Sequence, residues 1–285
     1  MKKILITGAR GMLATDYRAL YNTQYELLSY DREQLDITRL DTVREVLTQE
    51  RPDIVLNCAA YTNVDESERV GKKSVFDINS LGVYHLAQVT HELSIDLITI
   101  STDYVFDGSN SDGYKEYDEC HPINTYGMSK YLGEQLAQTE NPETIIVRTS
   151  WLYGGGKDFK NFVNTMITLA LTRSELKVVN DQHGIPTYTR DLSRALTDII
   201  EDIDTYRGRI LHLSNTAETG SITWYEFAQE IFHQTHTDIS VIPCTSQEFV
   251  SLAVRPQYSK LINESDIVLG NWKDGLREYL STLKS

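Results

Sequence analysis

Short apolar runs alternate with longer stretches of helical periodicity through the first half of the chain. The apolar runs predict five strands, Lys3–Thr7, Glu26–Tyr30, Ile54–Asn57, Leu97–Ser101 and Ile145–Thr149. Helices are predicted between them, near residues 12–22, 39–50, 74–94 and 126–139. Strands separated by helices form βαβ units. The pattern therefore predicts an α/β fold, a Rossmann-type doubly wound parallel sheet that is buried on both faces.

The pattern becomes less regular after about residue 150. Helices are predicted near residues 159–173, 189–203 and 223–236, with short strands near 210–213 and 239–242. We therefore expect residues 1–150 to form a dinucleotide-binding domain. Residues 151–285 are expected to form mainly a smaller, mixed lobe that binds substrate and can cross back into the sheet.

Composition limits the class of protein. With 285 residues, 40% hydrophobic and 24% charged, the chain is typical of a globular protein, without a signal peptide or an apolar run of transmembrane length. We expect it in the cytoplasm, with Cys58, Cys120 and Cys244 as reduced, mostly buried thiols that lack metal-ligand spacing. The net charge of −14 disfavours nucleic acid and anionic membranes as partners, but allows a small anionic ligand.

A glycine-containing turn follows the first predicted strand. In the stretch GARGMLA, Gly8 and Gly11 would let the backbone approach a pyrophosphate, which binds at the N-terminus of the following helix. Ala14 stands at the third position, where glycine is common, and is small enough for close packing of helix on sheet. A plain turn between strand and helix is the alternative.

The ends of the second and third strands carry further candidate cofactor contacts. Asp31 is placed to bind the ribose hydroxyls of NAD, whereas Arg32 is placed to bind the 2′-phosphate of NADP. The two together leave the choice of cofactor open, and a solvated loop pair is the alternative. Asp36 could reach the adenine, and the small Ala59 and Ala60 would let a cofactor pass over the third strand.

The fourth strand and the helix after it carry candidate catalytic groups. Ser101 or Thr102 could donate a hydrogen bond to a substrate carbonyl, or merely cap the strand. Tyr126 and Lys130 lie four residues apart, on one face of the predicted helix. A tyrosine has a pKa near 10, so we expect the lysine ammonium to favour the phenolate and lower that pKa. The same lysine could hold the nicotinamide ribose.

The same spacing recurs between Tyr153 and Lys157, in the stretch YGGGK. Three consecutive glycines disfavour a helix there. We therefore interpret the second match as chance.

Eight motifs along nearly the whole chain resemble the dTDP-4-dehydrorhamnose reductase family, within the extended short-chain dehydrogenase/reductase superfamily. They are GARGMLA, LDIT, CAAYTNVDESE, STDYVFDG, YGMSK, RTSWLYG, NDQHGIPTYTRDL and RPQYSKL. The resemblance implies reduction of the C4 keto group of a nucleotide sugar by NADPH or NADH. It implies a small-molecule substrate and a monomer or homodimer.

The resemblance also implies roles for individual residues. The catalytic residues would be Thr102, Tyr126 and Lys130. The cofactor would be bound by Gly8, Gly11, Met12, Leu13, Asp31, Arg32, Asp36, Ile37, Ala59, Ala60, Tyr61 and Thr62, together with the catalytic tyrosine and lysine. The substrate would be bound by Thr102, Asp103, Tyr104, Trp151 and Arg255, the last as a cation for the nucleotide end.

Two further comparisons with the family limit these expectations. Some members dimerise through acidic residues and magnesium. Asp16 is acidic where they carry one ligand, but the full set does not match, so no metal is predicted. Related dehydratases carry an Asp-Glu pair after the threonine, whereas this chain has Asp103 and Tyr104, which favours simple reduction. A related epimerase, another nucleotide-sugar reductase or a non-catalytic NADP-binding regulatory subunit are the alternatives.

Overall fold

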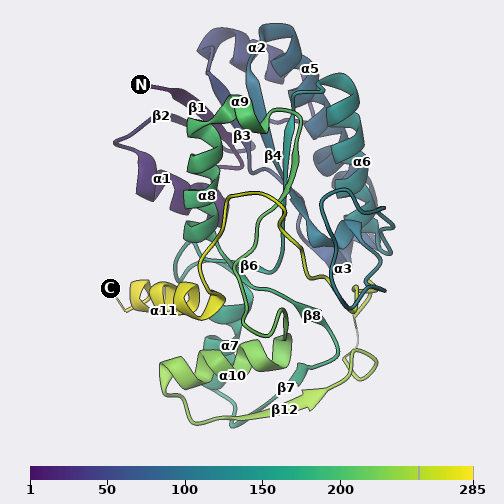
Figure 1. Cartoon of the computed structure of the whole chain (residues 1–285), viewed down its shortest axis with the longest axis vertical. Coiled ribbons are helices and arrows are strands. Elements are labelled where there is room, and N and C mark those ends of the chain that lie inside the picture. The colour runs from purple at the N-terminus through teal and green to yellow at the C-terminus, as the bar shows by residue number, and fades with distance from the viewer. Residues whose placement is uncertain (250, 285) are drawn as a thin grey trace.

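A six-stranded parallel sheet forms the centre of the computed structural model, which describes residues 1–249 and 251–284 (Figure 1). The strands lie in the order β10-β5-β4-β3-β1-β2. Their bounds are β1 Lys3–Thr7, β2 Glu26–Tyr30, β3 Ile54–Asn57, β4 Asp96–Thr102, β5 Ile145–Thr149 and β10 Ile210–His212. The predicted α/β fold with a doubly wound parallel sheet is confirmed, and four of the five strands predicted in the first half have the predicted bounds.

Helices cover both faces of the sheet because the strands are apolar on both sides. On one face, Ile4 and Ile6 pack in a core with residues of α1 (Met12–Tyr21) and α8 (Thr189–Glu201). On the other, Leu5 packs with residues of α2 (Leu40–Glu50), α5 (Val83–Leu93) and α6 (Thr125–Glu140). Figure 1 shows these two groups of helices on opposite sides of the sheet. Alternation along a single strand thus fills two cores.

The helix predicted near residues 74–94 has a more complex form. It comprises α4 (Lys72–Phe76), a π-helical segment (Asp77–Gly82) and α5. A Cβ atom at Gly82 would lie 2.6 Å from the Ile37 side chain, so glycine lets this segment approach the loop after β2. Helical periodicity alone does not reveal such a widened turn.

The chain after residue 150 builds a second lobe and also completes the first. Strand β10 pairs with β5 at the edge of the central sheet, and α8 packs on α1. The lobe itself contains α7 (Phe162–Ala170), α10 (Trp224–Thr235) and α11 (Trp272–Thr282), with the parallel pair β7 (Glu175–Val179) and β12 (Ser240–Cys244). Sequence periodicity did not predict β7 or α11.

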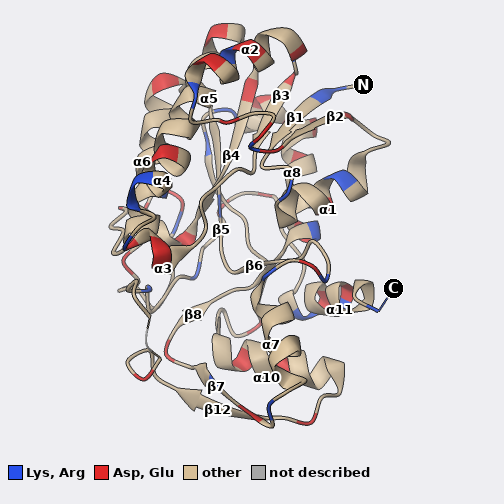
Figure 2. Ribbon diagram, turned by 180° about the vertical axis from the view of Figure 1, so that it is seen from behind, with Lys and Arg blue, Asp and Glu red and all other residues tan. Residues whose placement is uncertain are grey.

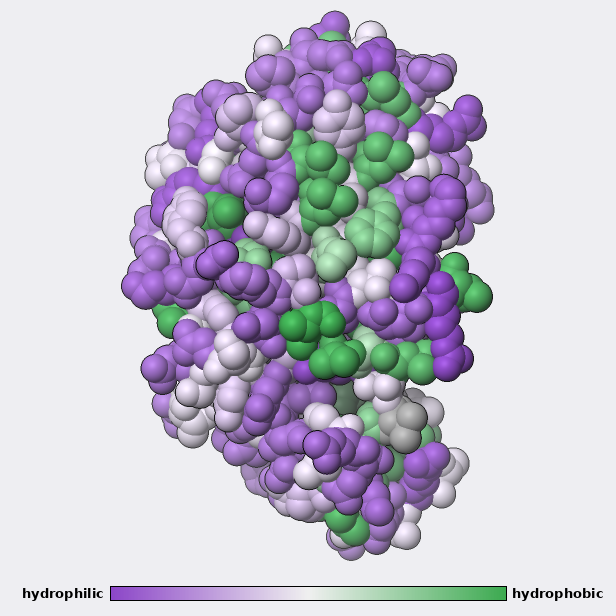
Figure 3. Space-filling view, turned by 90° about the vertical axis from the view of Figure 1, so that its right-hand side faces the viewer, coloured by the Kyte–Doolittle hydropathy of each residue, from purple (hydrophilic) through white to green (hydrophobic). Residues whose placement is uncertain are grey.

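Short elements connect these parts. They are α3 (Val64–Ser67), a 3₁₀ turn (Asp103–Val105), β6 (Leu152–Tyr153), β8 (His183–Gly184), β9 (Thr187–Tyr188), α9 (Ile203–Tyr206) and β11 (Ile222–Thr223). Figure 2 marks acidic residues in red along α2 and other outer helices. Figure 3 shows a band of apolar side chains along one face, with a hollow below it. Within the described residues, no helix is long and apolar enough to cross a membrane.

Candidate active site

The ends of β1 and β3 meet where the direction of chain winding reverses. From β1 the chain continues outward to β2 and then returns across β1 to β3. Ligands of open parallel sheets bind beyond the carboxyl ends of the strands at such a switch point. Two cavities adjoin there, of about 500 and about 400 Å³.

The two cavities share a floor and bring together most of the predicted site residues. Both are lined by Gly11, Cys58, Ala59 and Ala60. The larger is also lined by Met12, Leu13, Thr62, Thr102, Asp103, Tyr126, Lys130 and Trp151. The smaller is also lined by Gly8, Arg10, Asp31, Arg32, Asp36 and Ile37.

The glycine turn fits a dinucleotide at this floor. Gly8 has a φ of +66°, and a Cβ atom there would lie 2.7 Å from the backbone nitrogen of Ala59. Only glycine therefore allows the turn after β1 to lie so close to the end of β3. Gly11 follows as the N-cap of α1, so the N-terminus of this helix faces the larger cavity.

Charged groups line the smaller cavity, at the adenosine end of such a ligand. The Asp31 carboxylate accepts the backbone N–H of Glu33 at 2.9 Å and pairs with Arg10 at 2.6 Å. Partial burial opposes ionisation of Asp31, but backbone hydrogen bonds from Gln34 and Glu33 and the Arg10 guanidinium lower its pKa. Sequence reasoning missed Arg10, although its place inside the glycine turn was the available signal.

Helix α6, which carries Tyr126 and Lys130, begins at the N-cap residue Asn124. The Asn124 side chain accepts the backbone N–H of Gly127 at 2.7 Å, and its own amide donates to the carbonyl of Val254 at 2.8 Å. A Cβ atom at Gly127 would lie 2.1 Å from the carbonyl oxygen of Tyr104. This glycine therefore lets the first turn of α6 approach the 3₁₀ turn, which places Tyr126 edge-on to Tyr104 at 5.9 Å.

Lys130 lies one turn further along the same helix face, confirming the predicted helix. Its ammonium donates to the carbonyl of Ile100 at 2.6 Å, at the end of β4. Burial lowers the pKa of Lys130 to about 8, opposed by the nearby Glu134 carboxylate. Thr102 ends the same strand, where its hydroxyl donates to Asp103 at 3.0 Å and accepts the N–H of Tyr104 at 3.2 Å.

The pKa of Tyr126 runs opposite to the expected direction. Burial raises it to about 12, the Thr102 hydroxyl beside it opposes the rise, and the Asp103 carboxylate adds to it. The predicted lowering by Lys130 is therefore wrong for the protein without ligands. The physical reason is that the phenolate loses its hydration in the site, while the Lys130 ammonium is bound to a backbone carbonyl.

A buried ion pair holds α6 against the sheet. Arg148 on β5 donates to Glu134 at 2.7 and 3.0 Å, and Ser101 on β4 donates to the same carboxylate. Both charged side chains are at most 2% exposed. Since Glu134 is one turn beyond Lys130 and Ser101 precedes Thr102, these contacts keep α6 and β4 in register. Sequence reasoning did not identify it.

The predicted substrate residues are divided between two cavities. Asp103 and Trp151 line the cavity of about 500 Å³ that also contains Tyr126, where burial raises the pKa of Asp103 to about 7. Arg255 instead lines a separate cavity of about 660 Å³ in the second lobe and pairs with Asp65 at 3.0 Å. Trp151 stacks at 3.6 Å on Trp224, which lines that second cavity, so one aromatic pair separates the two.

Tyr104 and Tyr61 are not among the residues that line these three cavities. Tyr104 interacts with both Tyr126 and Arg255. Burial raises the pKa of Tyr104, and the Arg255 guanidinium opposes that rise. The Tyr61 hydroxyl turns to Glu66 at 2.8 Å, and its backbone N–H donates to Asn79 at 2.8 Å. The structure therefore does not direct the Tyr61 side chain into the cofactor cavities.

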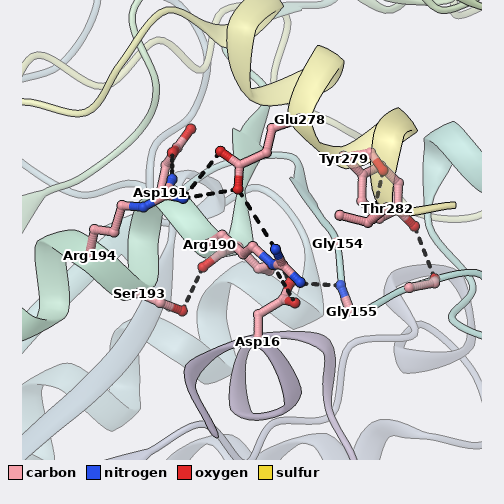
Figure 4. A network of polar contacts seen from close by, with 12 residues as sticks. Asp16, Gly154, Gly155, Arg190, Asp191, Ser193, Arg194, Glu278, Tyr279 and Thr282 are labelled. Atoms are coloured by element: carbon pink, nitrogen blue, oxygen red, sulfur yellow. Dashed lines mark hydrogen bonds and ion pairs between the residues drawn. The ribbon is translucent and has the colours of Figure 1, made fainter. Parts of the chain in front are cut away.

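Asp16 of α1 belongs to a network that joins the two lobes (Figure 4). Its carboxylate accepts the backbone N–H of Gly155 at 2.8 Å and the Thr189 hydroxyl, and it pairs with Arg190 at 3.3 Å. Arg190 in turn lies 3.8 Å from Glu278 of α11. Within the described residues, no group of three or more His, Cys, Asp or Glu side chains is arranged to hold a metal ion.

The second tyrosine–lysine match lies in a different environment. Residues 154–156 are not helical, which confirms the prediction for YGGGK. Tyr153 is fully buried, whereas Lys157 is exposed. The two side chains therefore do not share a site.

A Rossmann-type sheet with a glycine turn at its switch point, and a tyrosine and lysine one turn apart at the same edge, define an extended short-chain dehydrogenase/reductase fold. The chain matches the model of the RmlD substrate-binding domain family over residues 1–285 and belongs to that family.

Individual relatives agree with this membership. The spore coat polysaccharide biosynthesis protein SpsK of Bacillus subtilis (strain 168) is 38% identical, over 100% of this chain and 99% of its own. A dTDP-4-dehydrorhamnose reductase of Aggregatibacter actinomycetemcomitans is 39% identical, over 92% and 90%.

Solved structures agree as well. The crystal structure of a dTDP-4-dehydrorhamnose reductase from Clostridium acetobutylicum ATCC 824 superposes with a TM-score of 0.93, at 40% identity over 100% of both chains. The Bacillus anthracis str. Ames enzyme of the same name, in complex with NADP, gives 0.91 at 38% identity over 99% of both chains.

Proposed function

We propose that the protein reduces the C4 keto group of dTDP-4-dehydro-L-rhamnose to give dTDP-L-rhamnose, the last step in making this sugar donor for cell-surface polysaccharide. The observation that carries the proposal is the meeting of Thr102, Tyr126 and Lys130 in one cavity with the cofactor turn. The names of the relatives support the choice of substrate.

The chain's own groups have complementary roles in this reaction. When bound, NADPH or NADH supplies the hydride. Thr102 donates a hydrogen bond to the keto oxygen and Tyr126 gives it a proton, so Tyr126 acts as the general acid. Lys130 holds the nicotinamide ribose, and its ammonium lies one helical turn from the phenolate that forms on Tyr126 only after proton transfer.

The high pKa of Tyr126 suits an acid that must remain protonated until the keto oxygen becomes basic. As hydride reaches the carbon, negative charge grows on the oxygen, and proton transfer becomes favourable only then. A tyrosine in its resting phenolate form could not serve as the donor. Burial thus keeps the site in the protonation state required for reduction.

Tyr104 supports simple reduction over dehydration. It occupies the position where related dehydratases carry the glutamate of their Asp-Glu pair. Burial raises the pKa of Tyr104 above its usual value, so the phenol stays protonated and cannot serve as a base. Dehydration of the sugar would need a base at this position, and Tyr104 cannot supply it.

The second-lobe cavity supports a nucleotide at the far end of the substrate. It combines apolar side chains, including Trp224 and Phe249, with the cations Arg173, Lys177 and Arg255. A flat base suits the apolar part, and a phosphate group suits the cations. The stacked Trp151–Trp224 pair separates this cavity from the one that contains Tyr126, so a nucleotide sugar that occupies both would pass alongside this pair.

The direct test is oxidation of NADPH and NADH with dTDP-4-dehydro-L-rhamnose made in situ. We expect one cofactor oxidised per sugar reduced, and dTDP-L-rhamnose as the product. An epimerase or dehydratase would convert the sugar without net oxidation of the cofactor. Binding of NADPH without any turnover would instead favour a regulatory subunit.

We also propose a cytoplasmic protein that is a monomer or a homodimer. The free cysteines Cys58, Cys120 and Cys244 support a reducing compartment. The exposed Met128 and Leu132 on α6 support a homodimer contact. Light scattering at several protein concentrations distinguishes the two assemblies.

A further inference from the structure

The loop between β6 and α7, residues 154–161, is held in place along its length. Its three glycines have φ values of +148°, +74° and +106°, conformations that favour glycine. The Gly155 N–H donates to Asp16, and the carbonyl of Gly156 accepts the Tyr279 hydroxyl at 3.0 Å. Asn164 donates to the carbonyl of Phe159 at 2.8 Å. Since contacts from α1, α7 and α11 converge on it, the loop has a defined position.

Steric contacts place this loop directly on the cofactor turn. A Cβ atom at Gly155 would lie 3.0 Å from the Cα atom of Met12, the first residue of α1. Asn161, the N-cap of α7, lies with its amide 3.8 Å from the Met12 sulfur. The loop therefore faces the helix N-terminus that is expected to bind pyrophosphate.

Lys160 is carried by this loop to the rim of the catalytic cavity. It lines the cavity together with Gly11, Met12 and Leu13, which come from the opposite lobe. Across residues 1–249 and 251–284, Lys160 takes part in no ion pair. In a chain of net charge −14, an unpaired lysine at an anion-binding turn is a distinctive feature.

We propose that Lys160 binds a diphosphate group against the N-terminus of α1, so that the second lobe closes over a ligand held by the first. The assignment rests on the proposed function for the identity of the ligands. Two bound molecules contain this group, the cofactor and the nucleotide sugar. Lys160 lines the same cavity as Gly11, Met12 and Leu13, and its loop approaches Met12 at Gly155, on the side of the cofactor turn.

The hydrogen bonds of Asp16 hold in place the loop that carries this lysine. Asp16 belongs to the helix that follows the cofactor turn, yet it binds the backbone of the loop at Gly155 (Figure 4). It also accepts the Thr189 hydroxyl of α8. It thereby ties the loop that carries Lys160 to the helix that it faces. Asp16 is a positioning residue and makes no direct contact with the diphosphate.

The test compares Lys160→Met with Lys157→Met, which removes the same charge from the same loop outside the cavity. NADPH affinity is measured by fluorescence titration, and dTDP affinity by calorimetry on the NADPH complex. We expect Lys160→Met to weaken one of the two by about tenfold, as for a lost charged hydrogen bond. Lys160→Arg should restore most of the affinity, and Lys157→Met should bind like the wild type.

The two affinity measurements identify whether the cofactor or the nucleotide sugar supplies the diphosphate. Weaker NADPH binding assigns the group to the cofactor, whereas weaker dTDP binding assigns it to the nucleotide sugar. If both affinities are unchanged, or if Lys157→Met weakens them equally, the proposal is overturned. Because both arms measure binding, they give an answer even if the enzyme does not turn over the rhamnose precursor.

Discussion

Two tyrosine–lysine pairs with the same spacing occupy opposite environments in this molecule. Tyr126 and Lys130 share a face of α6 and line one cavity. Tyr153 lies in an aromatic core, with its ring stacked 5.6 Å from Tyr188, and Lys157 is exposed. The first pair lies at the carboxyl edge of the parallel sheet, and the second at the start of a glycine loop.

The difference shows that a four-residue spacing brings two side chains into one site only where the backbone is helical. In a helix, residues four apart lie on one face; in the extended, left-handed backbone of residues 154–156 they do not. The glycines that separate Tyr153 from Lys157 have a different use, because they allow close contact between the loop and α1. The same tyrosine–lysine spacing therefore arises for unrelated reasons in the two places, a shared helix face in one and a glycine loop in the other.

The strongest test of this comparison is removal of each hydroxyl. Tyr126→Phe should keep the fold and cofactor binding but lower kcat by about 10²–10⁴-fold, the usual contribution of a general acid. Tyr153→Phe should leave kcat nearly unchanged and cost about 1 kcal/mol of stability, since its hydroxyl only reaches the Trp272 carbonyl at 3.4 Å. A Tyr126→Phe enzyme with near-full rate would falsify the assignment.

Removal of each ammonium is the next test. Lys130→Met should weaken cofactor binding by roughly 10–100-fold, as expected for a hydrogen bond to a charged group. In the wild type, cofactor affinity should fall as pH rises through about 8, because burial lowers the pKa of Lys130 to that value. Lys157→Met should preserve both affinity and pH dependence. An unchanged affinity in Lys130→Met would show that this lysine does not hold the cofactor.

The glycines of the second pair allow a steric test. A Cβ atom at Gly154 would lie 1.7 Å from the Thr189 hydroxyl oxygen, whereas one at Gly156 meets nothing within 4 Å. Gly154→Ala should therefore cost about 3 kcal/mol or more of unfolding free energy, and Gly156→Ala only the backbone strain of about 1–2 kcal/mol. Denaturant unfolding measures both. Equal costs would mean that the contact with Thr189 is unimportant.

The smallest expected effect concerns the pH dependence of stability. The pKa of Lys130 is about 8 in the folded protein, below its ordinary value of 10.5. The unfolded chain therefore binds more protons between these values, and this site makes stability rise with pH across that window. Lys130→Met should flatten the rise and stabilise the protein at pH 7 by about 1–3 kcal/mol. A mutant with the same slope as Lys157→Met would contradict the depressed pKa.

Local features of the sequence predicted much of the site. Strand β1 and the turn at Gly8 follow from an apolar run that ends in glycine, and α6 follows from the helical periodicity near residues 126–139. Each depends on neighbours only a few residues away. The partners of these elements were not predictable in this way, because Glu134 meets Arg148 across 14 residues and Asp16 meets Thr189 across 173.

The sequence by itself determined the parallel sheet, the helix that bears Tyr126 and Lys130, and the turn expected to bind pyrophosphate, because periodicity and glycine placement act locally. Tertiary structure decided the protonation of Tyr126, the engagement of Asp31 by Arg10 and the position of Lys160. Those properties depend on burial and on charges brought together from distant segments. Desolvation and Coulomb interactions follow distances in space, which sequence spacing does not specify.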